Sequence, residues 1–196
     1  MTNSPTNLNL KKLLDFVQKS EKLKTLLRHS WLSSGRQESV AEHSWRIALM
    51  AILLKDYLKI KINLEKVLAM IIVHDLPEIF AGDHHAWKGR LKNKFALEKK
   101  GLNKLLKTLP PKQKTKIFNL WREYEDKKTA EAKFAKALDK LETIDQHNLA
   151  DLKTWVKEEY GYNLVHGKEE VKFDKVLQDL KKLIDKQTEM KVKKGK

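Results

Sequence analysis

The sequence predicts an all-α protein that folds as one domain. Apolar residues recur every three to four positions over most of the chain, whereas no segment alternates apolar and polar residues for long enough to indicate a strand. Only seven glycines and four prolines interrupt these patterns. The chain has 196 residues, of which 41% are hydrophobic, so it can bury a single core. We expect residues 1–190 to form this domain and residues 191–196 to be a basic, disordered tail.

Helix starts can be recognised in the first half of the sequence. The apolar spacing of residues 10–17 and 23–27 predicts two helices. Ser39 and Glu42 match a capping box, in which the serine side chain accepts a bond from a free backbone N–H and the glutamate reaches back to the serine. We therefore expect a long helix to begin here, and Asn63 can cap the next helix.

The second half of the sequence continues as helices joined by short connections. We expect helices over residues 90–108 and 112–126, with a Pro-Pro pair between them. Thr129 can cap a further helix, whose apolar residues repeat at helical spacing. A last helix is predicted from about residue 169 to residue 186.

The chain is strongly basic. It carries 41 lysines and arginines against 26 aspartates and glutamates, a formal net charge of +15. Such an excess attracts anions over a long range. The lysines are spread along most of the chain, and the sequence contains no zinc finger, Gly-aromatic RNA motif or basic zipper. We therefore do not expect nucleic-acid binding as the main function, and a small phosphorylated substrate would benefit from the same field.

Composition excludes several further classes of protein. No apolar run approaches the roughly 20 residues that span a membrane, and the polar N-terminus lacks the apolar core of a secretory signal. There is no cysteine, so disulfides, thiolate metal sites and cysteine nucleophiles are excluded. We expect a cytoplasmic protein that does not bind membranes.

Four polar residues lie where a core would be expected. His74 and Asp75 end the most apolar segment of the chain. His43 lies one turn into the predicted capped helix, and Asp139 lies on another apolar helix. Imidazole and carboxylate groups can ligate a divalent cation, and burying either one without a partner is costly. Taken singly, each also fits a hydrogen-bonded core histidine or a salt-bridged aspartate, and spacing alone does not join the four.

Three blocks of sequence resemble the HD-domain 5′-deoxynucleotidase family of metal-dependent phosphohydrolases. They are residues 36–44 (RQESVAEHS), residues 74–83 (HDLPEIFAGD) and, within residues 121–140, the segments WREYE, EAKF and LDK. The resemblance covers about residues 28–150. It implies a single HD-domain helical bundle that assembles as a homodimer.

The resemblance also implies one divalent ion held by four ligands: His43, His74, Asp75 and Asp139. Cobalt and manganese suit these donors, and magnesium, iron, zinc and nickel remain open. Such an ion lowers the pKa of a bound water and neutralises charge on phosphoryl oxygens.

Two further carboxylates follow the His-Asp pair. By the same likeness, Glu78 and Asp83 position the attacking water or transfer protons. The alternative for Glu78 is a favourable charge at a helix N-terminus after Pro77. Some members of the family use these two carboxylates and the next backbone carbonyl, here that of His84, for a second cation, and oxygen ligands suit magnesium there.

Three residues that precede His43 in the sequence, an aromatic residue and two arginines, are candidates for substrate binding. Arg28 matches the family's phosphate-binding arginine, whose planar guanidinium suits a phosphate. Trp31 is the candidate for an aromatic residue that packs on the sugar and disfavours a 2′-hydroxyl. Arg36 is a second candidate for phosphate contact, with a local ion pair as the alternative.

The implied function is hydrolysis of deoxynucleoside 5′-monophosphates to deoxynucleoside and phosphate. One alternative is an HD phosphohydrolase that acts on a cyclic nucleotide, a triphosphate or a signalling nucleotide. The other is a non-catalytic nucleic-acid-binding protein. Glu78 and Asp83 argue against the latter, because a protein without turnover has no need of them.

Overall fold

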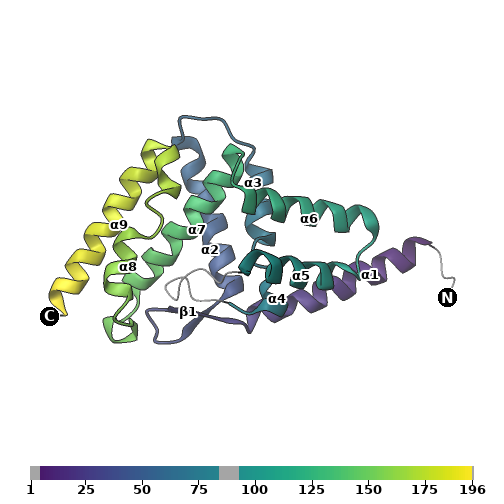
Figure 1. Ribbon diagram of the computed structural model, residues 1–196, viewed down its shortest axis with the longest axis horizontal. Helices are drawn as coiled ribbons and strands as arrows, with labels where there is room; N and C mark the ends of the chain where they lie inside the picture. The colour runs from purple at the N-terminus through teal and green to yellow at the C-terminus, as the bar shows by residue number, and fades with distance from the viewer. Residues whose placement is uncertain (1–4, 84–92, 196) are drawn as a thin grey trace.

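The protein is a helical bundle built around one long central helix. A computed structural model describes residues 5–83 and 93–195. The central helix α7 (Ala130–Leu149) lies between α8 (Glu159–Val165) and α9 (Lys175–Lys194) on one side and α2 (Val40–Leu54) on the other (Figure 1). The remaining helices are α1 (Pro5–Ser20), α3 (Leu64–Val73), α4 (Glu78–Ala81), α5 (Lys94–Leu106) and α6 (Pro111–Asp126). The all-α prediction is thereby confirmed. None of the described helices is long and apolar enough to cross a membrane.

Two groups of buried side chains form the core. The larger joins α2, α3 and α7 to α9, and it includes Ile47, Met70, Phe134, Leu138 and Leu177. The smaller lies beneath α5 and α6, and it includes Val40, Val73, Leu102, Leu105 and Trp121. Each of α2 and α3 contributes to both groups. His43 lies between Val40 and Ile47, and His74 follows Val73, so both histidines lie where the two groups meet.

The predicted helix caps are confirmed. At the start of α2, Glu42 N donates to Ser39 Oγ at 3.2 Å, and Ser39 N donates to Glu42 Oε2 at 2.8 Å, which completes the capping box. Asn63 Oδ1 accepts from Lys66 N at 3.1 Å at the start of α3. Thr129 Oγ1 accepts from Ala132 N at 3.3 Å at the start of α7. These bonds satisfy N–H groups that the helix itself leaves free.

A small hairpin replaces the short helix predicted over residues 23–27. A 3-10 turn, Glu21–Lys24, is followed by β1 (Leu27–Trp31), which pairs antiparallel with β2 (Gln37–Ser39). Gly35 permits the connecting turn through its φ of +85°. The strand is stabilised from outside, because Gln146 Nε2 on α7 donates to the carbonyl of Trp31 at 2.7 Å. Helical spacing of three leucines could not reveal this distant contact.

The C-terminal region also differs from expectation. The last helix begins at Lys175 rather than near residue 169, with Asp174 Oδ1 accepting from Val176 N at 2.9 Å as its cap. It continues to Lys194, so the prediction of a disordered tail from residue 191 was wrong for residues 191–194. No glycine or proline interrupts the helix before Gly195, and lysines in its last turn face the negative end of the helix dipole. The helix α8 was not predicted.

Candidate metal centre

The four predicted ligands come from three helical segments and converge beside a cleft whose described lining includes His74, Asp75 and Asp139. His43 lies on α2, His74 and Asp75 directly follow α3, and Asp139 lies on α7. One ligand atom each from His43, His74 and Asp75 lies within 4.8 Å of the other two. His74 Nε2 is 3.0 Å from Asp75 Oδ2, and His43 Nε2 is 4.0 Å from the same oxygen. Asp139 completes the group, with its Oδ1 3.3 Å from His43 Nε2.

Three of these ligand atoms are buried and lie 3.0–4.0 Å from charged groups of the same site without a described hydrogen bond. His43 Nε2, His74 Nε2 and Asp75 Oδ2 have no hydrogen-bond partner among the described residues. Burying polar atoms in this way costs free energy, so native proteins rarely leave them unsatisfied. Their convergence on one point, and their chemistry of two imidazoles beside two carboxylates, fit a divalent transition-metal ion.

The other ring nitrogen, Nδ1, of His43 and of His74 contacts an oxygen atom of the protein. His43 Nδ1 lies 2.5 Å from Glu142 Oε2, and His74 Nδ1 donates to the carbonyl of Ile71 at 2.6 Å. Bonds of this kind orient an imidazole so that Nε2 faces a metal. Burial and Arg28 lower the pKa of His43, but the carboxylates of Glu142 and Asp139 raise it to about 9 overall. A divalent ion held by His43 would have to displace a proton from this ring.

Asp139 is held in its ionised form. Its Oδ2 accepts from the hydroxyl of Tyr124 at 2.8 Å and lies 2.9 Å from Lys140 Nζ. Burial alone would raise the pKa of Asp139, but Lys140 and His43 hold it well below its ordinary value. One carboxylate oxygen is therefore fixed by Tyr124 and Lys140, whereas the other faces His43.

Glu78 and Asp83 line the same cleft. Glu78 opens α4 and is 7% exposed, and its Oε2 has no hydrogen-bond partner in the described chain. Burial, together with the charges of Asp75 and Asp83, raises the pKa of Glu78 well above its ordinary value. A group that is only a favourable helix-end charge would be solvated, so this burial favours a role in the cleft. His84, the third candidate ligand of a second cation, lies outside the described residues.

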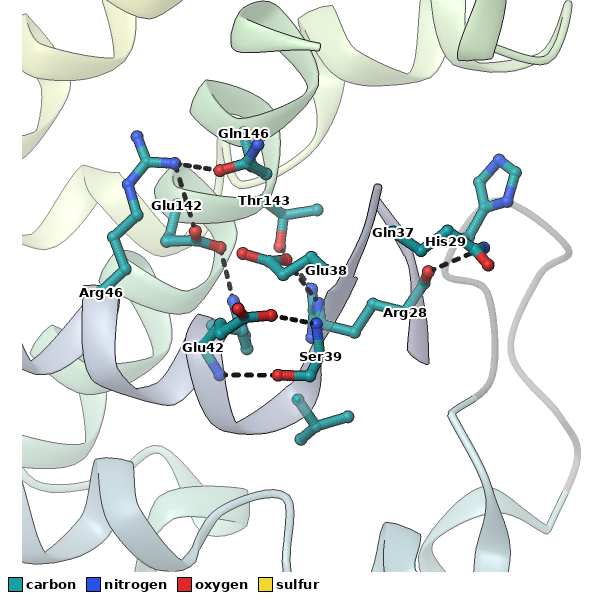
Figure 2. Close-up of polar contacts among 12 residues, drawn as sticks. Arg28, His29, Gln37, Glu38, Ser39, Glu42, Arg46, Glu142, Thr143 and Gln146 are labelled. Carbon is teal, nitrogen blue, oxygen red and sulfur yellow. Dashed lines mark hydrogen bonds and ion pairs between the residues drawn. The ribbon is translucent and has the colours of Figure 1, made fainter. Parts of the chain in front are cut away.

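Arg28 presents a buried positive charge to the cleft. It lies on β1, where Nη2 donates to Thr143 Oγ1 at 3.1 Å and Nε lies 3.3 Å from Glu38 Oε2 (Figure 2). Its Nη1 is 3.8 Å from Asp75 Oδ2. Burial lowers the pKa of Arg28, but the surrounding carboxylates more than offset this effect and raise it, so the guanidinium stays charged. Arg28 is thus fixed beside the four candidate metal ligands.

The structure does not bring Trp31 or Arg36 to the cleft, as its described lining contains neither residue. The pairing of β1 with β2 is irregular between Leu27 and Trp31, so Arg28, His29 and Ser30 all line the cleft, and Trp31 follows them outside its described lining. Arg36 pairs instead with Glu42, with Nη2–Oε1 and Nη1–Oε2 distances of 2.6 and 3.1 Å. The structure thus shows the local ion pair that was the alternative for Arg36, and phosphate contact by Arg36 stays a prediction.

Sequence reasoning missed much of the cleft wall. The described lining of the cleft also includes three lysines, namely Lys94, Lys136 and Lys140. It further includes the polar side chains of His29, His147, Glu159, Tyr162 and His166. No motif distinguishes the α8 residues, since they become neighbours of Asp139 only through packing. Lys140 lies within the third block of sequence, where its place beside Asp139 was the available signal.

Comparison with known proteins identifies the family. The model of a family described as "HD domain" matches residues 20–181. The 5′-deoxynucleotidase HDDC2 of Xenopus laevis is 37% identical over 139 residues, which cover 69% of this chain and 68% of that protein. The 5′-deoxynucleotidase HDDC2 of Dictyostelium discoideum is 38% identical over 141 residues, which cover 68% and 74%.

A solved structure supports the same assignment. It is the crystal structure of a predicted metal-dependent phosphohydrolase from Magnetospirillum magnetotacticum, which matches with a TM-score of 0.80 and 30% identity. The match covers 99% of this chain and 98% of that one. The resemblance seen in the sequence is thereby confirmed, and the chain belongs to the HD-domain family of metal-dependent phosphohydrolases.

Proposed function

We propose that this protein is a 5′-deoxynucleotidase, which hydrolyses deoxynucleoside 5′-monophosphates to deoxynucleoside and phosphate. The observation that carries the proposal is the convergence of three unsatisfied buried atoms, His43 Nε2, His74 Nε2 and Asp75 Oδ2, beside a buried arginine. The relatives named 5′-deoxynucleotidase support the choice of substrate. A divalent cation bound beside the buried guanidinium of Arg28 would suit the cleft to a phosphate ester.

The metal would be held by the four converging residues, His43, His74, Asp75 and Asp139. When bound, a divalent ion lowers the pKa of a coordinated water and stabilises charge on phosphoryl oxygens. Cobalt and manganese are the first candidates, because nitrogen and oxygen ligands together suit transition ions better than magnesium. We keep magnesium, iron, zinc and nickel as further candidates.

The remaining cleft residues would bind the phosphate and handle protons. Arg28 can donate hydrogen bonds to phosphate oxygens, and its ion pair with Glu38 and its hydrogen bond to Thr143 fix its orientation beforehand. Burial and the charges of Asp75 and Asp83 raise the pKa of Glu78 well above its ordinary value, which suits Glu78 to transfer a proton to the departing 5′-oxygen of the nucleoside. Asp83 lines the same cleft and can orient a water molecule.

The test is a phosphate-release assay on metal-loaded protein. Purified protein is stripped with a chelator, reloaded separately with cobalt and manganese, and incubated with each common deoxyribonucleoside and ribonucleoside 5′-monophosphate. We expect release from the deoxyribonucleotides, loss of activity on chelation and recovery on adding metal. Cyclic nucleotides and triphosphates belong in the same panel, because preferential cleavage of either would replace the proposed substrate. Absence of release from every monophosphate would refute the proposal.

We also propose that the protein forms a homodimer through the outer face of α2. Trp45, Leu49, Ile52 and Leu53 recur at helical spacing and are 66%, 40%, 49% and 61% exposed. Large apolar side chains that are exposed together on one face of a helix are typical of protein interfaces. Light scattering should give twice the monomer mass for the wild type, and Leu53→Glu should shift the protein to monomer. A monomeric wild type would exclude the dimer and leave the proposed reaction unaffected.

A further inference from the structure

The most deeply buried polar contact near the candidate metal centre involves a residue that no motif marks. His43 Nδ1 lies 2.5 Å from Glu142 Oε2, and both side chains are 0% exposed. The two residues are 99 positions apart and come from α2 and α7. A buried carboxylate is costly, so its position against one ring nitrogen of a candidate ligand requires a physical explanation.

One face of α7 holds both nitrogens of the His43 ring. Asp139 and Glu142 are three residues apart, so they lie on the same side of the helix. Asp139 Oδ1 is 3.3 Å from Nε2, whereas Glu142 Oε2 is 2.5 Å from Nδ1. The ring therefore lies between a candidate metal ligand and a second carboxylate that faces away from the metal position.

Glu142 is in turn held by a cation from α2. Arg46 Nη1 lies 3.6 Å from Glu142 Oε1 and also donates to Gln146 Oε1 (Figure 2). Arg46 Nη2 donates to Asp145 Oδ2 on the same helix. His74 has only a neutral partner at the equivalent nitrogen, the carbonyl of Ile71. The charged partner is therefore specific to His43.

The same carboxylate could instead belong to a second cation site. Ligand atoms of Glu38, His43 and Glu142 lie within 4.8 Å of one another. However, Arg28 Nε lies 3.3 Å from Glu38 Oε2, and Arg46 faces Glu142. These two guanidinium groups already supply the opposite charge, which makes another cation unfavourable here.

We propose that Glu142 is a positioning residue of the metal centre, which accepts a hydrogen bond from Nδ1 of His43 and so directs Nε2 toward the metal. The inference rests on the proposed function, because it takes His43 to be a metal ligand. A carboxylate behind a ligating histidine fixes its tautomer and ring orientation and makes it a more basic ligand. Glu142 does not touch the substrate or the metal.

The test compares metal affinity in the wild type and in Glu142→Gln. Cobalt affinity is measured by competition with a chelator, and the absorption spectrum of the bound cobalt reports its ligand geometry. We expect affinity to fall roughly 10- to 100-fold and the spectrum to change. Glu159→Gln is the matched control, since Glu159 is also a buried glutamate near histidines, at 1% exposure, but has no contact with His43. It should retain wild-type affinity and spectrum.

Each outcome decides the inference. If Glu142→Gln binds cobalt as tightly as the wild type and with the same spectrum, the inference is overturned while the proposed function stands. If the wild type binds no divalent ion, the proposed function fails, and the inference fails with it. A second measurement needs no variant: nitrogen-15 NMR of the zinc-loaded wild type should show a proton on Nδ1 of His43 and metal at Nε2. The reverse assignment would overturn the inference.

Discussion

Two clusters of histidine and carboxylate line one cleft, and they differ in what their ring nitrogens contact. In the metal-centre cluster, His43 and His74 each leave Nε2 buried without a hydrogen-bond partner in the described part of the protein. In the second cluster, His147 Nδ1 is 3.1 Å from Asn163 Oδ1, and its Nε2 is 3.1 Å from the carbonyl of His29. His147 thus has both ring nitrogens hydrogen-bonded, whereas His43 and His74 each have one, and this difference separates a structural histidine from the two candidate ligands.

The second cluster connects the C-terminal region to the rest of the protein. Glu159 on α8 accepts from Val156 N at 2.8 Å and lies 3.3 Å from His29 Nε2 on β1. Trp155 Nε1 donates to the carbonyl of His147 at 2.9 Å. These contacts close one wall of the cleft. His147 is hydrogen-bonded through both ring nitrogens and so stabilises the fold, whereas Nε2 of His43 and Nε2 of His74 face carboxylates of the candidate metal centre and can bind an ion.

Removing a carboxylate from the metal-centre cluster should have the largest effect. We expect Asp75→Ala to lose bound metal and to lower activity roughly 1,000-fold, equivalent to about 4 kcal/mol of transition-state stabilisation. Metal content by mass spectrometry and phosphate release measure the two effects. Asp56→Ala, at an aspartate whose side chain is 77% exposed, is the control and should change neither. Full retention of metal would remove Asp75 from the ligand set.

The next largest effect should come from the arginine between the two clusters. Arg28→Lys keeps the charge, but lysine cannot reproduce the separate Nε and Nη2 contacts to Glu38 and Thr143. We expect kcat/KM to fall roughly 10- to 100-fold with metal content unchanged, because phosphate is then held less rigidly. Arg122→Lys, at a side chain that is 59% exposed, is the control. Unchanged steady-state kinetics in Arg28→Lys would exclude a phosphate-binding role.

Altering the second cluster should affect stability rather than metal binding. We expect His147→Phe to lower the free energy of unfolding by about 1–3 kcal/mol, because Asn163 Oδ1 loses its buried partner. Urea unfolding measures this loss, and cobalt affinity should remain that of the wild type. A large drop in cobalt affinity with the fold intact would mean that the two clusters are not separate in function.

The smallest effect is expected outside both clusters, at Arg36. Its hydrogen bonds lower the pKa of Glu42 to about 2, so the pair stabilises the fold above the ordinary carboxyl pKa. Arg36→Ala should leave kcat/KM unchanged and slightly reduce Tm at pH 7. This difference from the wild type should disappear as the pH falls toward 2, where Glu42 is protonated in the folded state as well. Impaired turnover at neutral pH would return Arg36 to the substrate site.

Local signals predicted the helices well and the hairpin poorly. Caps at Ser39, Asn63 and Thr129 act within three residues, so the sequence alone identifies them. The strand β1 depends on Gln146, which lies 115 positions from Trp31, and no local pattern carries that information.

The sequence by itself determined the helical class, most helix starts and, through three family blocks, the identity of the candidate metal ligands. Helix formation and capping depend on neighbours along the chain, which makes them readable from sequence. Only the tertiary structure decided which buried polar atoms make hydrogen bonds within the protein and which do not. Glu142 against His43 and Glu159 against His29 are contacts between distant segments, created when α7 packs against α2 and when α8 closes the cleft. Burial then decides their chemistry, since an unsatisfied polar atom is costly only where water cannot reach it.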